Sequence, residues 1–124
     1  AIAVAINILV TGARLVWSSS SALLDAAMSR EDVARVSAVL DRYRSETVDF
    51  HGLQTRVSGR TRFVSVHVLV PGAWSVQQAH DLVEEVEADL RSELEQVEVT
   101  THVEPREDDR SYADHRFDAT HRDD

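Results

Sequence analysis

The sequence contains no cysteine and no lysine, and these two absences exclude several kinds of site. Without cysteine the chain has no disulfide, no thiolate metal ligand and no cysteine nucleophile. Any transition-metal site must therefore be built from histidine and carboxylate side chains. All 13 basic residues are arginine, against 22 aspartates and glutamates, and the formal net charge is −9. This charge argues against a nucleic-acid partner and is compatible with attracting cations.

Motifs that serve catalysis are also missing. The 4 glycines are dispersed, so there is no glycine-rich loop of the kind that cradles a phosphate. The serine run over 18–21 lacks the strand–turn–helix setting of a nucleophile elbow. We interpret Glu84, Glu85 and Glu87 as a solvated helix face rather than an acid–base pair. We therefore expect that the chain is not an enzyme.

The first 17 residues are strongly apolar, with Asn7 and Thr11 as the only polar side chains before Arg14. A full bilayer span needs about 20 apolar residues, and this run supplies part of that length. A signal peptide would place its positive charge before the apolar run, whereas here Arg14 follows it. Arg14 and Trp17 are typical of anchors at the cytoplasmic end of a membrane helix. We interpret residues 1–28 as the end of a transmembrane helix and a linker helix; the alternative is an amphipathic helix buried in a soluble core.

After residue 28 the spacing of apolar residues changes from helical to strand-like and back. It predicts a helix over 30–44, strands over 47–57 and 61–70, a helix over 75–94 and a strand over 96–104. Ser29 and Ser75 are suitable N-caps for the two helices. Helices packed on one side of a small sheet form an α+β two-layer sandwich, here over residues 29–105. Residues 106–124 are charged, follow Pro105 and have no apolar periodicity, so we expect a disordered acidic tail.

The predicted sheet is small and open. Three strands covered by helices on one side leave one face and an edge exposed. Exposed sheet surfaces of this kind are often covered by a second copy of the same chain. We therefore expect the domain to form a homodimer.

The histidines are the candidate metal ligands. His67 points away from the valine face of its strand, and His102 and Glu104 are two residues apart and share a face. His51 lies in the first strand and His80 early in the second helix. Neutral imidazole and carboxylate together suit Zn²⁺ and similar divalent ions. The alternative is that these are ordinary polar residues on a solvated face, which is how we interpret His115 and His121.

Several segments, in the same order and with matching spacing, resemble the cytoplasmic domain of the cation diffusion facilitator family. They are Val48–Arg56 (VDFHGLQTR) with Gly59, Arg62–Val64 and His67, then Ser75–Asp81 (SVQQAHD) and Val99–Pro105 (VTTHVEP). Upstream, Ala13–Leu15 through Leu23–Asp25 is similar to the last membrane helix of that family where it enters the domain. The likeness covers about residues 1–105.

The resemblance implies a ferredoxin-like or metallochaperone-like αββαβ fold that pairs into a V-shaped homodimer. It also implies a metal site for Zn²⁺, or for another divalent transition metal such as Mn, Fe, Co, Cd or Ni. The positions that match zinc ligands are His51, His67, His80, His102 and Glu104, with the carboxylate able to bridge two ions. Gly52 departs from the family pattern, in which Asp is common, and so do Gln54, where Arg is common, and Glu104, which is Asp in some members.

The function implied by the resemblance is regulation of a divalent-cation efflux transporter in the cell membrane. The domain would lie on the cytoplasmic side, attached to the membrane part of the transporter, and bound metal would favour the closed dimer. Transport itself uses earlier membrane helices, which this sequence does not include, so we expect no transport by the chain alone. The rival interpretation is a metal-independent dimerisation or small-ligand-sensing module of the same shape.

Overall fold

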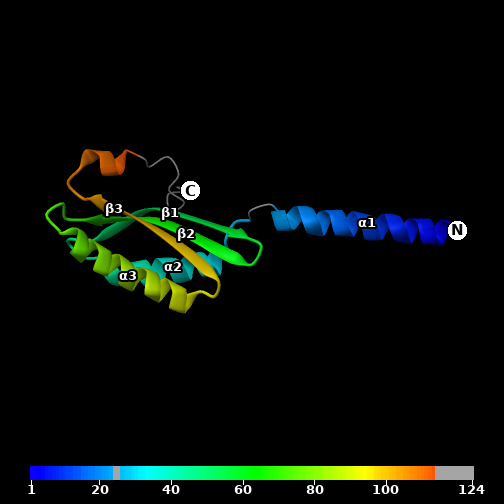
Figure 1. The fold of residues 1–124 in the computed structure, drawn as a ribbon, viewed down its shortest axis with the longest axis horizontal. Coiled ribbons are helices and arrows are strands. Elements are labelled where there is room, and N and C mark those ends of the chain that lie inside the picture. Colours follow the sequence, from blue (N-terminus) through cyan, green and yellow to red (C-terminus); the bar gives the residue numbers. More distant parts are fainter. Residues whose placement is uncertain (24–25, 114–124) are drawn as a thin grey trace.

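The computed structural model describes residues 1–23 and 26–113. In chain order the elements are α1 (Ile2–Leu23), α2 (Arg30–Tyr43), β1 (Asp49–Ser58), β2 (Thr61–Val70), α3 (Val76–Glu93), β3 (Val97–Pro105) and a short 3₁₀ helix, η1 (Asp109–Tyr112). From α2 to β3 this is the predicted αββαβ order, and each boundary lies within two residues of the predicted one. The α+β two-layer fold is thus confirmed, and an apolar helix precedes it (Figure 1).

Serine side chains fix the starts of the two domain helices. Ser29 caps α2 by accepting a hydrogen bond from the Asp32 backbone N–H at 3.0 Å. Ser75 and Gln78 form a complete capping box at the start of α3. Each cap satisfies backbone N–H groups that have no partner within the helix, and this is why the helices begin at these serines.

The sheet has the order β1-β2-β3, with β1 antiparallel to β2 and β3 parallel to β2. Gly59 turns the β1–β2 hairpin with a φ of +60°, a conformation that glycine adopts without strain. The parallel pairing requires a crossover, which α3 provides. Both α2 and α3 lie on the same face of the sheet, called the inner face below (Figure 1). Among the described residues, no long helix lies over the other face, called the outer face.

The core lies between the inner face and the two helices. Val64, Val66 and Val68 alternate along β2 and are at most 1% exposed. They pack in one cluster with residues of both helices, including Val36 of α2 and Leu90 of α3, which are both fully buried. The period-2 valine pattern of β2 therefore determines which face is buried, and it leaves the odd-numbered side chains, His67 among them, on the outer face.

The linker after α1 differs from the sequence-based expectation. We interpreted residues 1–28 as helical up to the end of the linker, but α1 ends at Leu23. Ala26 instead forms an isolated antiparallel bridge with Val57 of β1, with two N–H···O distances of 2.8 Å, and Met28 is buried in the core. The edge of β1 offers backbone groups that have no partner strand within the sheet, and Ala26 pairs with them at Val57.

Helix α1 extends away from the domain (Figure 1). Its segment Ile2–Ser20 is long and apolar enough to cross a membrane, judged by length and composition, and none of it is buried. Its large apolar side chains, from Ile2 to Trp17, are 44–78% exposed. The alternative prediction, an amphipathic helix buried in a soluble core, is therefore wrong.

The segment after β3 also differs from expectation in its first part. Residues 106–113 were predicted to begin a disordered tail, but they form a turn and η1 and fold back onto the sheet. This segment has no apolar periodicity, and backbone and side-chain hydrogen bonds hold it to the domain instead. One is the bond from the Arg106 N–H to the Val70 carbonyl, at 2.8 Å. Residues 114–124, the rest of the predicted tail, lie outside the described residues.

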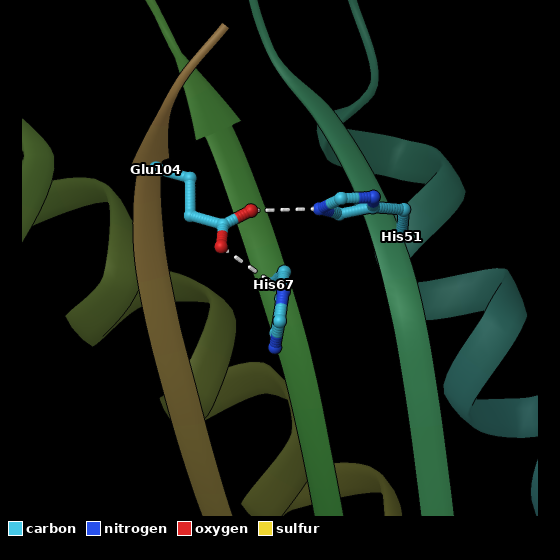
Figure 2. Close-up of side chains that lie close together, drawn as sticks. All are labelled: His51, His67 and Glu104. Atoms are coloured by element: carbon cyan, nitrogen blue, oxygen red, sulfur yellow. Dashed lines mark hydrogen bonds and ion pairs between the residues drawn. The ribbon is translucent and has the colours of Figure 1, made fainter. Parts of the chain in front are cut away.

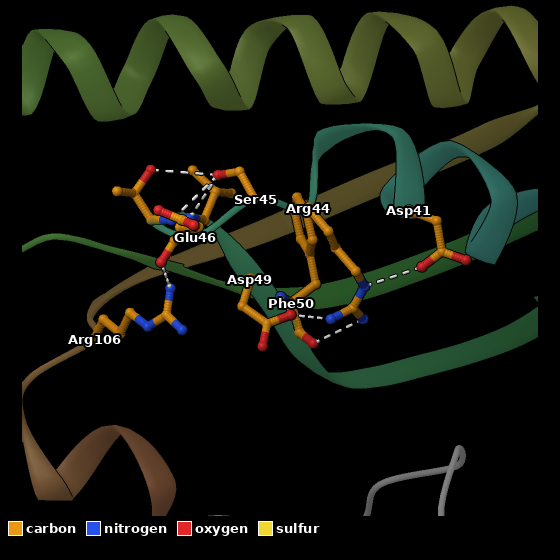
Figure 3. Close-up of polar contacts among 9 residues, drawn as sticks. Asp41, Arg44, Ser45, Glu46, Asp49, Phe50 and Arg106 are labelled. Carbon is orange, nitrogen blue, oxygen red and sulfur yellow. Dashed lines mark hydrogen bonds and ion pairs between the residues drawn. The ribbon is translucent and has the colours of Figure 1, made fainter.

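Arginine side chains hold the loop between α2 and β1 (Figure 3). Arg44 donates to Asp41 of α2, to Asp49 at the start of β1, and to the carbonyl of Phe50 at 3.1 Å. Arg106, from the segment after β3, donates to the carbonyl of Glu46 within the loop. These contacts connect the end of α2, the start of β1 and the C-terminal segment, and so position the residue that follows Phe50, which is His51.

Tyr43 links the two helices and gives the fold a measurable pH dependence. Its hydroxyl donates to Asp89 of α3 at 2.8 Å, and burial together with this carboxylate raises the pKa of Tyr43 from 10.0 to about 12. The stabilising contribution is complete below pH 10 and is lost as the pH rises toward 12, because the unfolded chain releases the proton first. We expect urea titrations to show a steeper loss of stability over this range in wild type than in Tyr43→Phe. Equal alkaline slopes would contradict this.

Candidate metal centre

The strand register places three histidines side by side on the outer face. His51 of β1 is paired with His67 of β2, and His67 is paired with His102 of β3. Neighbouring ring centroids are 5.2 Å apart for His51 and His67 and 5.1 Å apart for His67 and His102. The sequence predicted that His67 and His102 face away from the valine core. The pairing of strands adds that they form one row with His51.

Glu104 brings this row together. It lies two residues after His102 on β3, and its carboxylate extends across the sheet toward the other strands (Figure 2). Oε2 is 2.8 Å from His51 Nε2, and Oε1 is 3.3 Å from His67 Nδ1. Oε1 is also 3.5 Å from His102 Nε2. A single carboxylate thus contacts one histidine from each strand of the sheet.

The donor atoms fit a small divalent ion. One ligand atom each from His51, His67 and Glu104 lies within 4.8 Å of the other two. Zinc bonds of about 2.0–2.1 Å in a tetrahedral site correspond to ligand atoms about 3.3 Å apart. The 2.8 Å contact between His51 and Glu104 is shorter than this, so it must lengthen when an ion enters.

The centre is sheltered on one side and open on the other. The His51 and Glu104 side chains are each 14% exposed, that of His67 is 26% exposed and that of His102 is 66% exposed. Partial removal of water strengthens the attraction between a carboxylate and a cation. The exposed His102 side gives an ion a route from solvent, and leaves room there for further ligands.

A β-bulge shapes the β1 side of the centre. The register shifts between His51 and Gln54, and Gly52 within the bulge has a φ of +61°. A Cβ built on Gly52 would be 3.5 Å from the His67 ring, so this position also faces the centre. In the sequence, Gly52 stands out only as a departure from the family pattern. A glycine inside a strand pattern is itself a signal of a bulge, and that signal was missed.

His80 is not brought to the row within one chain. It is exposed on α3, and α3 packs on the inner face of the sheet, whereas the row lies on the outer face. Its place in the metal site, as a ligand from a second subunit, stays a prediction. His115 and His121, interpreted as solvated residues, lie outside the described residues.

Tyr112 is a neighbour of the centre that the sequence did not reveal. Its ring centroid is 5.8 Å from that of His51, with the ring planes inclined by 57°. No apolar periodicity surrounds Tyr112, and the charged tail gave no reason to expect residues 106–113 to fold back.

Comparison with known proteins agrees with the fold. Residues 28–106 match the family of the cation efflux protein, cytoplasmic domain. An uncharacterized transporter of Synechocystis sp. is 39% identical over 112 residues, which cover 90% of this chain and 36% of that protein. The cation-efflux pump FieF of Serratia proteamaculans is 30% identical over 105 residues, covering 85% and 35% of the two chains. This chain thus spans about a third of the length of these relatives.

Solved structures of similar domains include metal-loaded forms. The metal-bound C-terminal domain of the CzcD transporter from Thermotoga maritima is 29% identical with a TM-score of 0.57, covering 65% of this chain and 98% of that one. CzrB, a candidate zinc transporter solved in its Zn form, is 35% identical with a TM-score of 0.59, covering 66% and 93%. By its sequence, its fold and this match over most of the domain, the chain belongs to the cation diffusion facilitator family, as a cytoplasmic domain of a cation efflux protein.

Proposed function

We propose that this domain is the metal-sensing regulatory domain of a divalent-cation efflux transporter, with zinc as its preferred ion. The observation that carries the proposal is the position of the Glu104 carboxylate, within 3.5 Å of a nitrogen of His51, His67 and His102 on three different strands. In this proposal His51, His67 and Glu104 bind one ion. His102 binds at the open side, where Glu104 can bridge to a second ion that a second subunit helps to hold through His80.

Bound metal acts in this proposal by favouring a closed homodimer. A ligand shifts an equilibrium between two states only by the difference in its affinity for them. An ion shared between Glu104 and ligands of a second subunit binds the closed dimer more tightly than the open one, and so selects it. The outer face beyond the histidine row carries half-buried side chains, such as Phe63 and Ser65, that a second copy can cover.

The membrane location of the whole protein is part of the same proposal. Helix α1 carries an exposed apolar surface that is unfavourable in water, and inserting it in a bilayer removes that cost. Arg14 and Trp17 then lie at the cytoplasmic interface. The Ala26–Val57 bridge joins this helix to β1, the strand that carries His51. The aligned part is only 36% and 35% of the two relatives named as transporters, and transport belongs to the membrane part that they also contain.

Zinc titration by calorimetry tests the proposal, using the full chain in detergent because α1 is apolar. We expect wild type to bind zinc, and His67→Ala to weaken binding most among the single histidine variants, because His67 is central in the row. His102→Ala is expected to have a smaller effect, since that side chain is more exposed. His115→Ala is the control and should bind as wild type does. Absence of binding by wild type, or equal binding by all four proteins, would leave the metal-independent dimerisation module.

A further inference from the structure

The segment after β3 is attached to the domain at several separate points. The Arg106 N–H donates to the Val70 carbonyl at the end of β2, at 2.8 Å, and the Glu107 carboxylate accepts from the Gly72 N–H at 2.9 Å. Arg106 also donates to the carbonyl of Glu46, in the loop before β1. Within the segment, Ser111 Oγ donates to the Pro105 carbonyl at 2.8 Å, and Ser111 is only 5% exposed. Residues 106–113 thus form a fixed structure, which we call the C-terminal strap.

The strap lies on the outer face, on the opposite side of the sheet from α2 and α3 (Figure 1). Burial along β2 gives independent evidence of this position. Its odd-numbered residues point to the outer face, and those from 61 to 67 are half-buried, but Leu69 is only 3% exposed. Leu69 is the next outward residue after His67, toward the end of β2 where the strap is attached. The strap therefore covers the part of the outer face that adjoins the metal centre.

Tyr112 is the strap residue that contacts the centre. Its hydroxyl donates to the Arg106 carbonyl at 3.1 Å, which holds the ring in place from within the strap. Its ring lies 5.8 Å from the His51 ring, and the His67 ring is 5.2 Å from His51. Two rings thus neighbour the His51 imidazole, whose Nε2 faces Glu104. The exposure of the ligands follows the same order, being lowest for His51 and Glu104 and highest for His102.

We propose that Tyr112 is a positioning residue for the metal centre, and that the C-terminal strap closes one side of it and slows the release of bound metal. This inference rests on the proposed function. Tyr112 is not a ligand; it limits the orientations of the His51 imidazole to those that direct Nε2 toward Glu104. Without it, metal binding must pay the cost of ordering that side chain, and water reaches the ligands from the strap side as well.

Zinc release from the full chain in detergent tests this inference. The zinc-loaded protein is mixed with an excess of a coloured chelator, and the release rate and the affinity are measured for wild type and variants. For Tyr112→Ala we expect release to be about 10-fold faster and affinity to fall about 10-fold, the low end of what loss of a residue that orients a ligand costs. Tyr112→Phe keeps the ring against His51 and loses only the hydrogen bond to the Arg106 carbonyl, so its release rate and affinity should change less than those of Tyr112→Ala. Arg110→Ala is the control, because its side chain is 90% exposed and pairs with Asp108 inside the same strap.

A double-mutant cycle separates positioning of His51 from a general loosening of the fold. If Tyr112 acts through His51, adding Tyr112→Ala to His51→Ala should change zinc affinity by less than 2-fold, on the order of the noise in such cycles. An additive loss in the double variant would overturn the positioning role. The positioning role would also be overturned if Tyr112→Ala released zinc at the wild-type rate, or if Arg110→Ala accelerated release as much as Tyr112→Ala does. Zinc binding by wild type would still support the proposed function in either case. Absence of zinc binding by wild type would overturn both.

Discussion

Glu104→Gln is expected to reduce zinc affinity more than any other single replacement in the domain. Glutamine keeps the size and shape of the side chain but removes the negative charge and the carboxylate that contacts all three histidines. A neutral amide is a poor ligand for zinc beside imidazoles, which carry no charge when they bind. We expect a loss of at least about 100-fold, above the range typical of residues that only support a ligand. Calorimetric titration of the full chain with zinc measures it.

Glu98→Gln is the matched control for this replacement. Glu98 lies on the same strand and, at an even-numbered position like Glu104, on the same face, but outside the row of histidines. The Glu98→Gln variant loses the same charge as Glu104→Gln, so it reports any effect of net charge alone on cation binding. A similar loss of affinity in both variants would mean that zinc responds to the acidic surface and not to a coordination site.

Leu90→Ala is expected to have the largest effect on folding. Leu90 is fully buried where α3 packs on the sheet, and it belongs to the main core cluster. Removing its branched side chain leaves a cavity and should lower the free energy of unfolding by about 2–5 kcal/mol. Val76→Ala, in the same helix, is the control, because Val76 is 88% exposed and its replacement should change stability by no more than about 0.5 kcal/mol. Chemical denaturation followed by circular dichroism measures both.

The same variant connects folding to metal binding. An ion that binds only the folded domain adds about 2.7 kcal/mol of stability at a free concentration 100 times its dissociation constant. Zinc is therefore expected to restore much of the stability that Leu90→Ala loses, because Leu90 is in α3, which packs on the inner face, whereas the centre lies on the outer face. Equal stability of Leu90→Ala and Val76→Ala would contradict the assigned core. Stability of Leu90→Ala that does not change with zinc would contradict coupling between the centre and the fold.

The fold could be predicted because local patterns determine most of it. The valines of β2 alternate without interruption, and Ser29 and Ser75 mark the helix starts, so the elements and their faces followed from spacing. The linker and the strap could not be predicted this way. Ala26 and Arg106 are held by backbone hydrogen bonds to Val57 and Val70, which lie far from them in the sequence. Backbone pairing of this kind leaves no periodic trace in side-chain hydrophobicity.

The sequence predicted which residues form the candidate site better than it predicted how they are arranged. The face shared by His102 and Glu104 followed from their spacing, and the resemblance to a family identified His51 and His80. The alignment of His51 with His67 depends on the hairpin register and on the bulge at Gly52, and neither is determined by spacing within one strand. The position of Tyr112 beside His51 depends on the folding of the strap over the sheet, which the sequence pattern does not predict.

The most direct test of the metal centre is zinc anomalous diffraction from crystals of the zinc-loaded chain. We expect a strong anomalous peak on the outer face, about 2.0–2.1 Å from an imidazole nitrogen of His67 and from a carboxylate oxygen of Glu104. His51 should complete the protein ligands from the same chain, with Tyr112 still against its ring. Zinc found only at surface carboxylates or at histidines 115 and 121, with Glu104 still bonded to His51 and no ion between them, would contradict a metal centre formed by His51, His67 and Glu104.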